Sequence, residues 1–202
     1  KRRKYLHSAE EVRAYATQLR AILREIGVNS GDMEKGVIRF EANVSIRPTG
    51  SLELGTRVEI KNLNSFRAME RGIAYELDRQ ARLLDQGEKV TQETLGWNEA
   101  EQVTYSQRSK EEAHDYRYFP EPDLPPLVIE TDWIERIRMT LPELPRQKSL
   151  RMQRDYNLRP VEAAKLTEDR EICEFFETCV KSLKQGTART AAAWITGELF
   201  AW

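Results

Sequence analysis

The chain has 202 residues, of which 40% are hydrophobic and 32% charged, a composition typical of one substantial core, or of one domain and part of a second. Lys and Arg (32) nearly balance Asp and Glu (33), which excludes a global positive field for nucleic-acid binding, so any RNA contact must be local or shared with a partner. No run approaches the roughly 18 apolar residues of a membrane span, and Lys1–Lys4 are not followed by the apolar stretch of a signal peptide. We therefore expect an intracellular protein without a membrane segment.

The first predicted element is a surface helix. Ser8 followed by Glu11 forms a capping-box pattern, and apolar residues recur at helical spacing from Val12 until Gly27.

Two strands are predicted next, because the hydrophobic period changes to two. Residues 38–47 alternate between apolar and polar side chains, and the same alternation returns at 57–61. Pro48–Gly55, with one proline and two glycines between the runs, indicates a hairpin loop.

The remaining elements follow from caps and breakers. Asn64 or Ser65 can cap a helix that stops at Gly87. Beyond it we predict strands at Lys89–Thr94 and Gln102–Arg108 around a turn at Asn98, an extended proline-rich segment at Tyr116–Leu127, and helices starting near Pro160, Thr167 and Thr187.

These elements predict an α+β fold. Residues 1–146 form a body of antiparallel strands and helices, and residues 147–202 form an incomplete all-helical domain.

The two cysteines, Cys173 and Cys179, lie in a helical pattern without a CxxC companion or a nearby histidine. This spacing argues against zinc and favours two reduced structural thiols.

The polar faces of the first two strands are the main candidate for chemistry. Strand parity puts Arg39, Glu41 and Asn43 on one face, and Glu59 and Lys61 on one face of the next strand. If both faces point the same way, carboxylates, cations and an amide gather in a patch that can hold a hard divalent metal and phosphate oxygens. The alternative is a solvated face with cross-strand ion pairs.

The segment Lys61–Ser65 lies where a strand passes into a helix. Free backbone N–H groups and the helix dipole favour an anion there, which makes Asn62 and Asn64 candidate nucleotide-binding residues. The alternative is that Asn64 and Ser65 only cap the helix.

Basic, acidic and aromatic residues alternate from Arg108 to Pro120. An RNA end can stack on such tyrosines, with Lys110 and Arg117 at phosphates, although a buried structural network explains the composition equally well. His114 has no spaced partner and is predicted to be structural. The sequence has no GxSxG and no Walker-type loop, so the common hydrolase and P-loop classes lack support.

Four segments together resemble the B-subunit family of tRNA-dependent amidotransferases. They are Met33–Gly36, Arg39–Ser45, Glu59–Ser65 and Lys110–Leu127, the last including Asp-Tyr-Arg-Tyr-Phe-Pro-Glu-Pro-Asp-Leu-Pro-Pro-Leu. The resemblance covers roughly Ser8 to the end of the chain.

The resemblance implies a carbon–nitrogen ligase with glutamine as amide donor. ATP and Mg²⁺ would serve to phosphorylate the side-chain carboxylate of Glu-tRNA(Gln) or Asp-tRNA(Asn), and ammonia would then displace the phosphate. The ammonia would come from a separate glutaminase (A) subunit, and a small third (C) subunit would join the glutaminase to the B-type protein. In this family the catalytic body is a cradle fold, followed by a helical domain and a tail domain that bind tRNA.

For individual residues, the resemblance implies that Glu41 and Glu59 are metal ligands and, with Lys61, catalytic, while Arg39, Asn43 and Lys61 line the nucleotide site. It implies that the N-terminal part of the cradle and the tail domain lie outside this chain, so we expect the 202 residues alone to be inactive. It places the protein in a bacterial cytoplasm or an organelle.

Two other hypotheses stay open at this point. The chain can be an RNA-binding or partner-docking module that uses the surface around Tyr116, or a structural homologue without chemistry.

Overall fold

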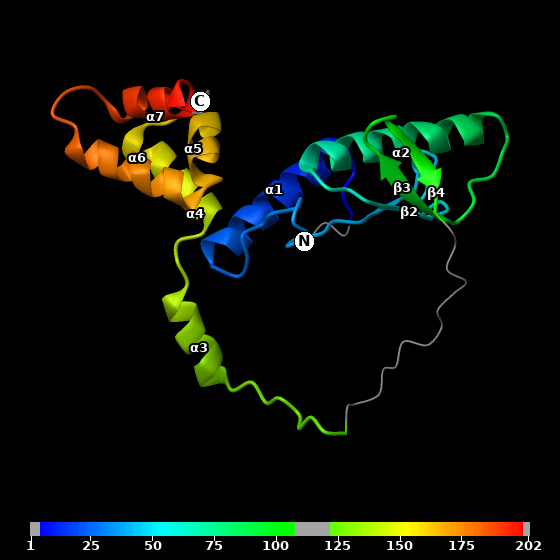
Figure 1. Cartoon of the computed structure of the whole chain (residues 1–202), viewed down its shortest axis with the longest axis horizontal. Helices are drawn as coiled ribbons and strands as arrows, with labels where there is room; N and C mark the ends of the chain where they lie inside the picture. Colours follow the sequence, from blue (N-terminus) through cyan, green and yellow to red (C-terminus); the bar gives the residue numbers. More distant parts are fainter. Residues whose placement is uncertain (1–4, 108–121, 200–202) are drawn as a thin grey trace.

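A helix lying across one face of a small sheet organises the first half of the chain (Figure 1). The computed structural model describes residues 5–107 and 122–199. In chain order the elements are α1 (Ala9–Glu25), β1 (Ala42–Val44), β2 (Val58–Lys61), α2 (Phe66–Asp85), β3 (Thr94–Asn98), β4 (Val103–Ser106), α3 (Thr131–Thr140), α4 (Pro145–Tyr156), α5 (Pro160–Thr167), α6 (Arg170–Ser182) and α7 (Ala188–Thr196).

The sheet has the order β1-β2-β3-β4 and is mixed. The outer pairs are antiparallel, and the central pair, β2 and β3, is parallel. The α+β class is confirmed, but the sheet is not purely antiparallel, because α2 carries the chain back to the end at which β2 began.

The helix caps match the sequence patterns. The Ser8 side chain accepts a hydrogen bond from the N–H of Glu11, and Ser65 accepts one from Ala68. The carboxylate of Glu11 accepts from the backbone N–H of His7, one residue before the cap itself. The local signals therefore fixed where α1 and α2 begin.

The first strand is shorter than its alternation predicted. Only Ala42–Val44 pair with β2, whereas alternation runs over residues 38–47. Beyond Val44 the side chain of Gln80, from α2, takes the place of a neighbouring strand. Its Nε2 donates to the carbonyl of Val44, and its Oε1 accepts from the N–H of Ile46.

The hairpin loop then forms as predicted, with Gly55 so close to the carbonyl oxygen of Ile46 that any Cβ there would clash.

The prediction of a strand at Lys89–Thr94 was wrong, because β3 is Thr94–Asn98. The buried Leu95 and Trp97 decide its position, since their side chains pack on the core face of the sheet. The turn at Asn98 is confirmed: its side-chain oxygen accepts hydrogen bonds from the next N–H groups, those of Ala100 and Glu101.

A second hydrophobic cluster holds α4 to α7 together. Met152, Leu166 and Phe176 are fully buried in it, and Tyr156 packs edge-on against Phe176. All described elements after residue 147 are helices, but α6 begins at Arg170 with Asp169 as its N-cap, later than the predicted start near Thr167. The domain boundary at 146/147 stays a prediction.

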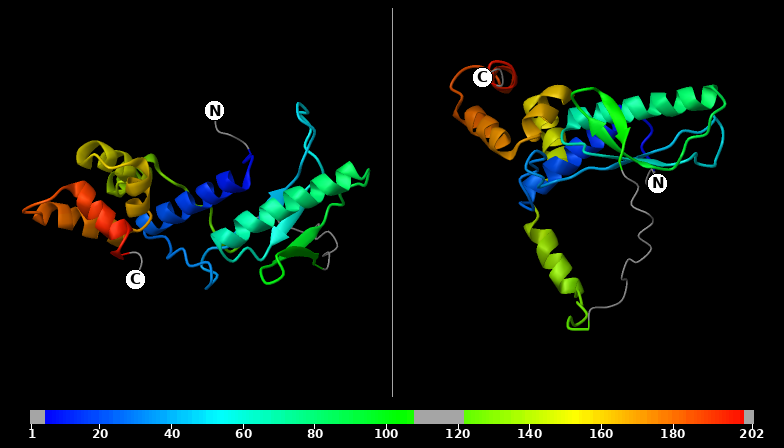
Figure 2. Two further views of the ribbon diagram at one scale, coloured as in Figure 1. Left: turned by 90° about the horizontal axis from the view of Figure 1, so that it is seen from above. Right: turned by 45° about the vertical axis from the view of Figure 1, so that its right-hand side comes forward.

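Helix α3 lies apart from both hydrophobic clusters in Figures 1 and 2. The sequence analysis did not predict this helix, which has no buried residue. Trp133, Ile134 and Ile137 are all exposed on it. Within the described ranges, no helix is both long and apolar enough to cross a membrane.

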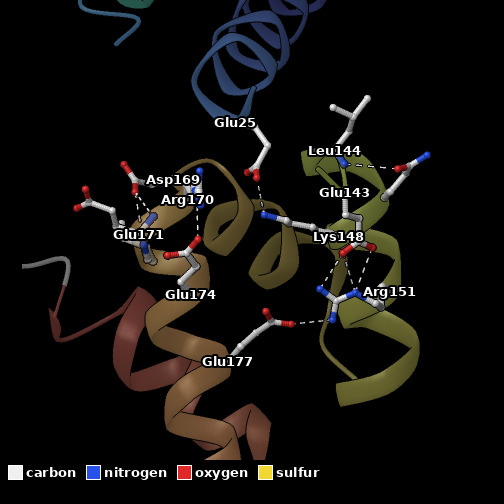
Figure 3. A network of polar contacts seen from close by, with 12 residues as sticks. Glu25, Glu143, Leu144, Lys148, Arg151, Asp169, Arg170, Glu171, Glu174 and Glu177 are labelled. Atoms are coloured by element: carbon white, nitrogen blue, oxygen red, sulfur yellow. Dashed lines mark hydrogen bonds and ion pairs between the residues drawn. The ribbon is translucent and has the colours of Figure 1, made fainter. Parts of the chain in front are cut away.

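The first body and the helical bundle meet where the end of α1 contacts α4 (Figure 3). The carboxylate of Glu25 lies 2.8 Å from the ammonium of Lys148, with the two side chains only 5% and 12% exposed. Arg24 pairs with Asp169 at 2.7 Å beside it. Such a pair, withdrawn from water, is costly to break because the remaining charge stays buried.

We predict that Lys148→Met lowers the free energy of unfolding by about 3 kcal/mol, because it leaves Glu25 buried without its cation. The measurement is denaturant unfolding of the full chain, with Arg82→Met as the control. Arg82 pairs with Asp78 on the open surface of α2, so its loss should change stability by well under about 1 kcal/mol. The double variant Glu25→Gln/Lys148→Met should recover part of the loss, and equal losses in the single and double variants would contradict this interpretation.

We also predict that Cys173 is a poor nucleophile in the folded protein. Burial raises the pKa of its thiol from 9.0 to about 11, so the thiol stays protonated at neutral pH. Iodoacetamide should therefore modify the half-buried Cys179 first, as mass spectrometry of the alkylated peptides can show.

The same shift in pKa predicts a loss of stability in alkali. The unfolded chain ionises this thiol before the folded chain does, so the contribution of Cys173 is complete below pH 9 and disappears as the pH rises towards about 11. A Cys173→Ala variant should lack this component of the pH dependence.

Candidate functional site

The face of the sheet opposite α2 is polar. Register decides which side chains share it: Asn43 is opposite Glu59, Glu59 is beside Thr94, and Lys61 is beside Gly96. The alternate residues, such as Val44 and Ile60, point to the other side and join the core under α2.

Two carboxylates converge on one cation at this face. The ammonium of Lys61 lies 3.7 Å from Glu41 Oε1 and 4.0 Å from Glu59 Oε2. These distances are too long for hydrogen bonds, and all three side chains are partly exposed, so each pair contributes little to stability. Lys61 therefore does not hold either carboxylate firmly in place.

A hydroxyl group orients one of the two carboxylates. Thr94 Oγ1, at the start of β3, donates to Glu59 Oε2 at 3.0 Å. The sequence analysis missed Thr94 because it placed the third strand too early, although the alternation from Thr94 to Trp97 carries the signal.

A second hydrogen bond crosses the face at its other end. Asn62 has a left-handed backbone (φ 63°), and its Nδ2 donates to the hydroxyl of Tyr105 on β4 at 3.0 Å. The ring of Tyr105 lies over Gly96, where a Cβ would come within 2.5 Å of the ring. Glycine at 96 is therefore required for this tyrosine to reach Asn62.

The other predicted site residues are placed differently. Arg39 precedes β1, and its guanidinium lies beside Gly36. Asn64 is exposed, and the cap of α2 comes from Ser65, so the capping alternative holds for Ser65 alone.

The predicted RNA-stacking surface cannot be placed in the same way. The residues from Arg108 to Pro120, which include His114, lie outside the described residues.

The donor set fits a magnesium ion that keeps water or phosphate ligands. Among residues 5–107 and 122–199 there is no group of three or more His, Cys, Asp or Glu side chains that could hold a metal. Mg²⁺ in nucleotide sites commonly takes only one or two carboxylates and completes its shell with water and phosphate oxygens. Glu41 and Glu59 supply that number.

The polar face is an open surface. Hollows of about 480 and 750 Å³ are found elsewhere, the smaller between α6 and α7 and the larger between α1 and the start of α4. The larger one contains Arg13, which already pairs with Glu70, and neither hollow includes a predicted site residue.

Comparison with known proteins agrees with the motifs. Residues 3–135 match the family model of the GatB/GatE catalytic domain. Three curated relatives, each named as the B subunit of aspartyl/glutamyl-tRNA(Asn/Gln) amidotransferase, come from Herpetosiphon aurantiacus (54% identity over 95% of this chain), Thermomicrobium roseum (50% over 97%) and Roseiflexus castenholzii (50% over 96%). The chain spans 40–41% of the length of these relatives. By its match over residues 3–135, the chain belongs to the GatB/GatE catalytic domain family.

Proposed function

We propose that this chain is part of the B subunit of a tRNA-dependent amidotransferase, and that the polar face of its sheet contributes to an ATP and Mg²⁺ site. The reaction is phosphorylation of the side-chain carboxylate of Glu-tRNA(Gln) or Asp-tRNA(Asn), followed by amidation with ammonia. The observation that carries the proposal is the convergence of Glu41 and Glu59 on Lys61, on the sheet face opposite α2. The names of the relatives, each a B subunit, support the reaction class.

Phosphoryl transfer needs positioning and charge neutralisation more than a covalent nucleophile. A bound Mg²⁺ would neutralise charge on the phosphates during transfer. Glu41 and Glu59 would hold it by carboxylate oxygens, and the ammonium of Lys61 offers three donors to phosphate oxygens. Asn43 and Asn62 place side-chain amides on either side of this cluster.

We extend the proposal to the whole assembly. Ammonia comes from glutamine hydrolysed by a glutaminase (A) subunit, a third (C) subunit joins the two, and mischarged tRNA delivers the carboxylate. The side chains of Glu41, Glu59 and Lys61 are partly exposed, so the charged 3′ end of a tRNA can approach them.

We predict that Glu59→Gln in the full-length protein, assembled with its partner subunits, slows phosphorylation of tRNA-bound glutamate on the order of 100-fold. The substitution keeps the size of the side chain and removes one metal-binding charge, so the fold and tRNA affinity should remain. Transfer of label from γ-³²P-ATP to Glu-tRNA measures the first step, and glutamine hydrolysis is followed separately.

Glu88→Gln is the matched control, because Glu88 is exposed beyond the end of α2, the helix on the opposite face of the sheet. It should phosphorylate at the rate of the unmodified enzyme. If Glu59→Gln does so too, the carboxylate is structural, and an RNA-binding or partner-docking role becomes the better account of this chain.

A further inference from the structure

Thr94 occupies the position in β3 that pairs with Glu59 in the parallel register. Its hydroxyl donates to Glu59 Oε2 at 3.0 Å, which joins two strands that are 35 residues apart in sequence at that point. The contact lies on the polar face, beside the ammonium of Lys61.

The sheet backbone on both sides of Thr94 fixes the direction of this hydroxyl. Hydrogen bonds fix the backbone on both sides: the N–H of Glu59 donates to the carbonyl of Glu93 at 3.0 Å, and the N–H of Gln107 donates to the carbonyl of Thr94 at 3.1 Å. Threonine is β-branched, so few χ1 rotamers are open to it in a strand. The donor is thus built into the sheet and does not depend on a flexible side chain.

The hydrogen bond affects the two carboxylate oxygens of Glu59 differently. Oε2 accepts from Thr94 and is the oxygen closest to Lys61. Among the described residues, Oε1 has no hydrogen-bond donor, so its lone pairs are available. One oxygen is therefore fixed and the other is left for a ligand.

We propose that Thr94 is a positioning residue that holds the carboxylate of Glu59 in the orientation needed to bind a divalent cation. The inference rests on the proposed function, because it assigns a role to Thr94 through Glu59. Groups that orient a metal ligand in this way lower the cost of fixing its rotamer on binding, and their loss typically weakens metal affinity by roughly 10- to 100-fold.

The test is binding of Mn²⁺, a spectroscopic substitute for Mg²⁺, to the full-length protein in its complex. The electron paramagnetic resonance signal of free Mn²⁺ gives the Kd without any turnover. Thr94→Val is nearly isosteric and keeps the β-branch, and it should raise the Kd roughly 10-fold or more. Thr94→Ser restores the hydroxyl and should recover most of the lost affinity.

Thr104→Val is the matched control from the same sheet. The hydroxyl of Thr104 is buried, and the described residues offer it no hydrogen-bond partner, so its removal should leave the Kd unchanged. Circular dichroism verifies that each variant is folded, and Thr94→Ala replaces Thr94→Val if the latter does not fold.

The outcomes separate the two proposals. An unchanged Kd in Thr94→Val, together with weakened binding in Glu59→Gln, overturns the role of Thr94 and leaves the metal site in place. Unchanged binding in Glu59→Gln overturns the site and with it this inference. Equal weakening in Thr94→Val and Thr104→Val also overturns it, because the effect would then belong to the sheet as a whole.

Discussion

Packing of α2 against one face of the sheet is the constraint on which the first half of the molecule depends. The helix approaches most closely at Gly72, where a Cβ would lie 3.2 to 3.4 Å from Leu63 and Trp97. The buried Gln80 continues the contact by hydrogen bonding the backbone of Val44. Because α2 also forms the connection between β2 and β3, the same packing makes this strand pair parallel and, among the described residues, puts α2 on the face opposite the polar one.

The charged side chains of these strands lie on the polar face, because they cannot be buried in the core without partners. Burying the charged side chains of Glu41, Glu59 and Lys61 would cost desolvation free energy. Since side chains alternate between the two faces of a strand, these three lie on the face opposite the core. Two carboxylates and one ammonium leave the cluster with an excess of negative charge, which attracts a divalent cation more strongly than an exposed ion pair does. In the proposed function, the sheet would provide one wall of the site and the oxygen donors for the cation.

A different kind of interaction connects this body to the helical bundle. The bundle has its own apolar core around Phe176, and its contact with α1 includes two ion pairs, Glu25 with Lys148 and Arg24 with Asp169. Charged pairs are directional, so they fix the orientation of the bundle more than they add to its stability.

The sequence by itself determined the elements whose signals are local. Caps at Ser8 and Ser65 began the two long helices, and the period of two put Glu59 and Lys61 on one face.

The tertiary structure alone decided where β1 ends and where β3 lies. Strand β1 ends where the side chain of Gln80, from a helix distant in sequence, bonds its backbone, and β3 lies where Leu95 and Trp97 can be buried in the core. It also brought Thr94 to Glu59, since strand pairing joins residues far apart in the chain and periodicity carries no information about register.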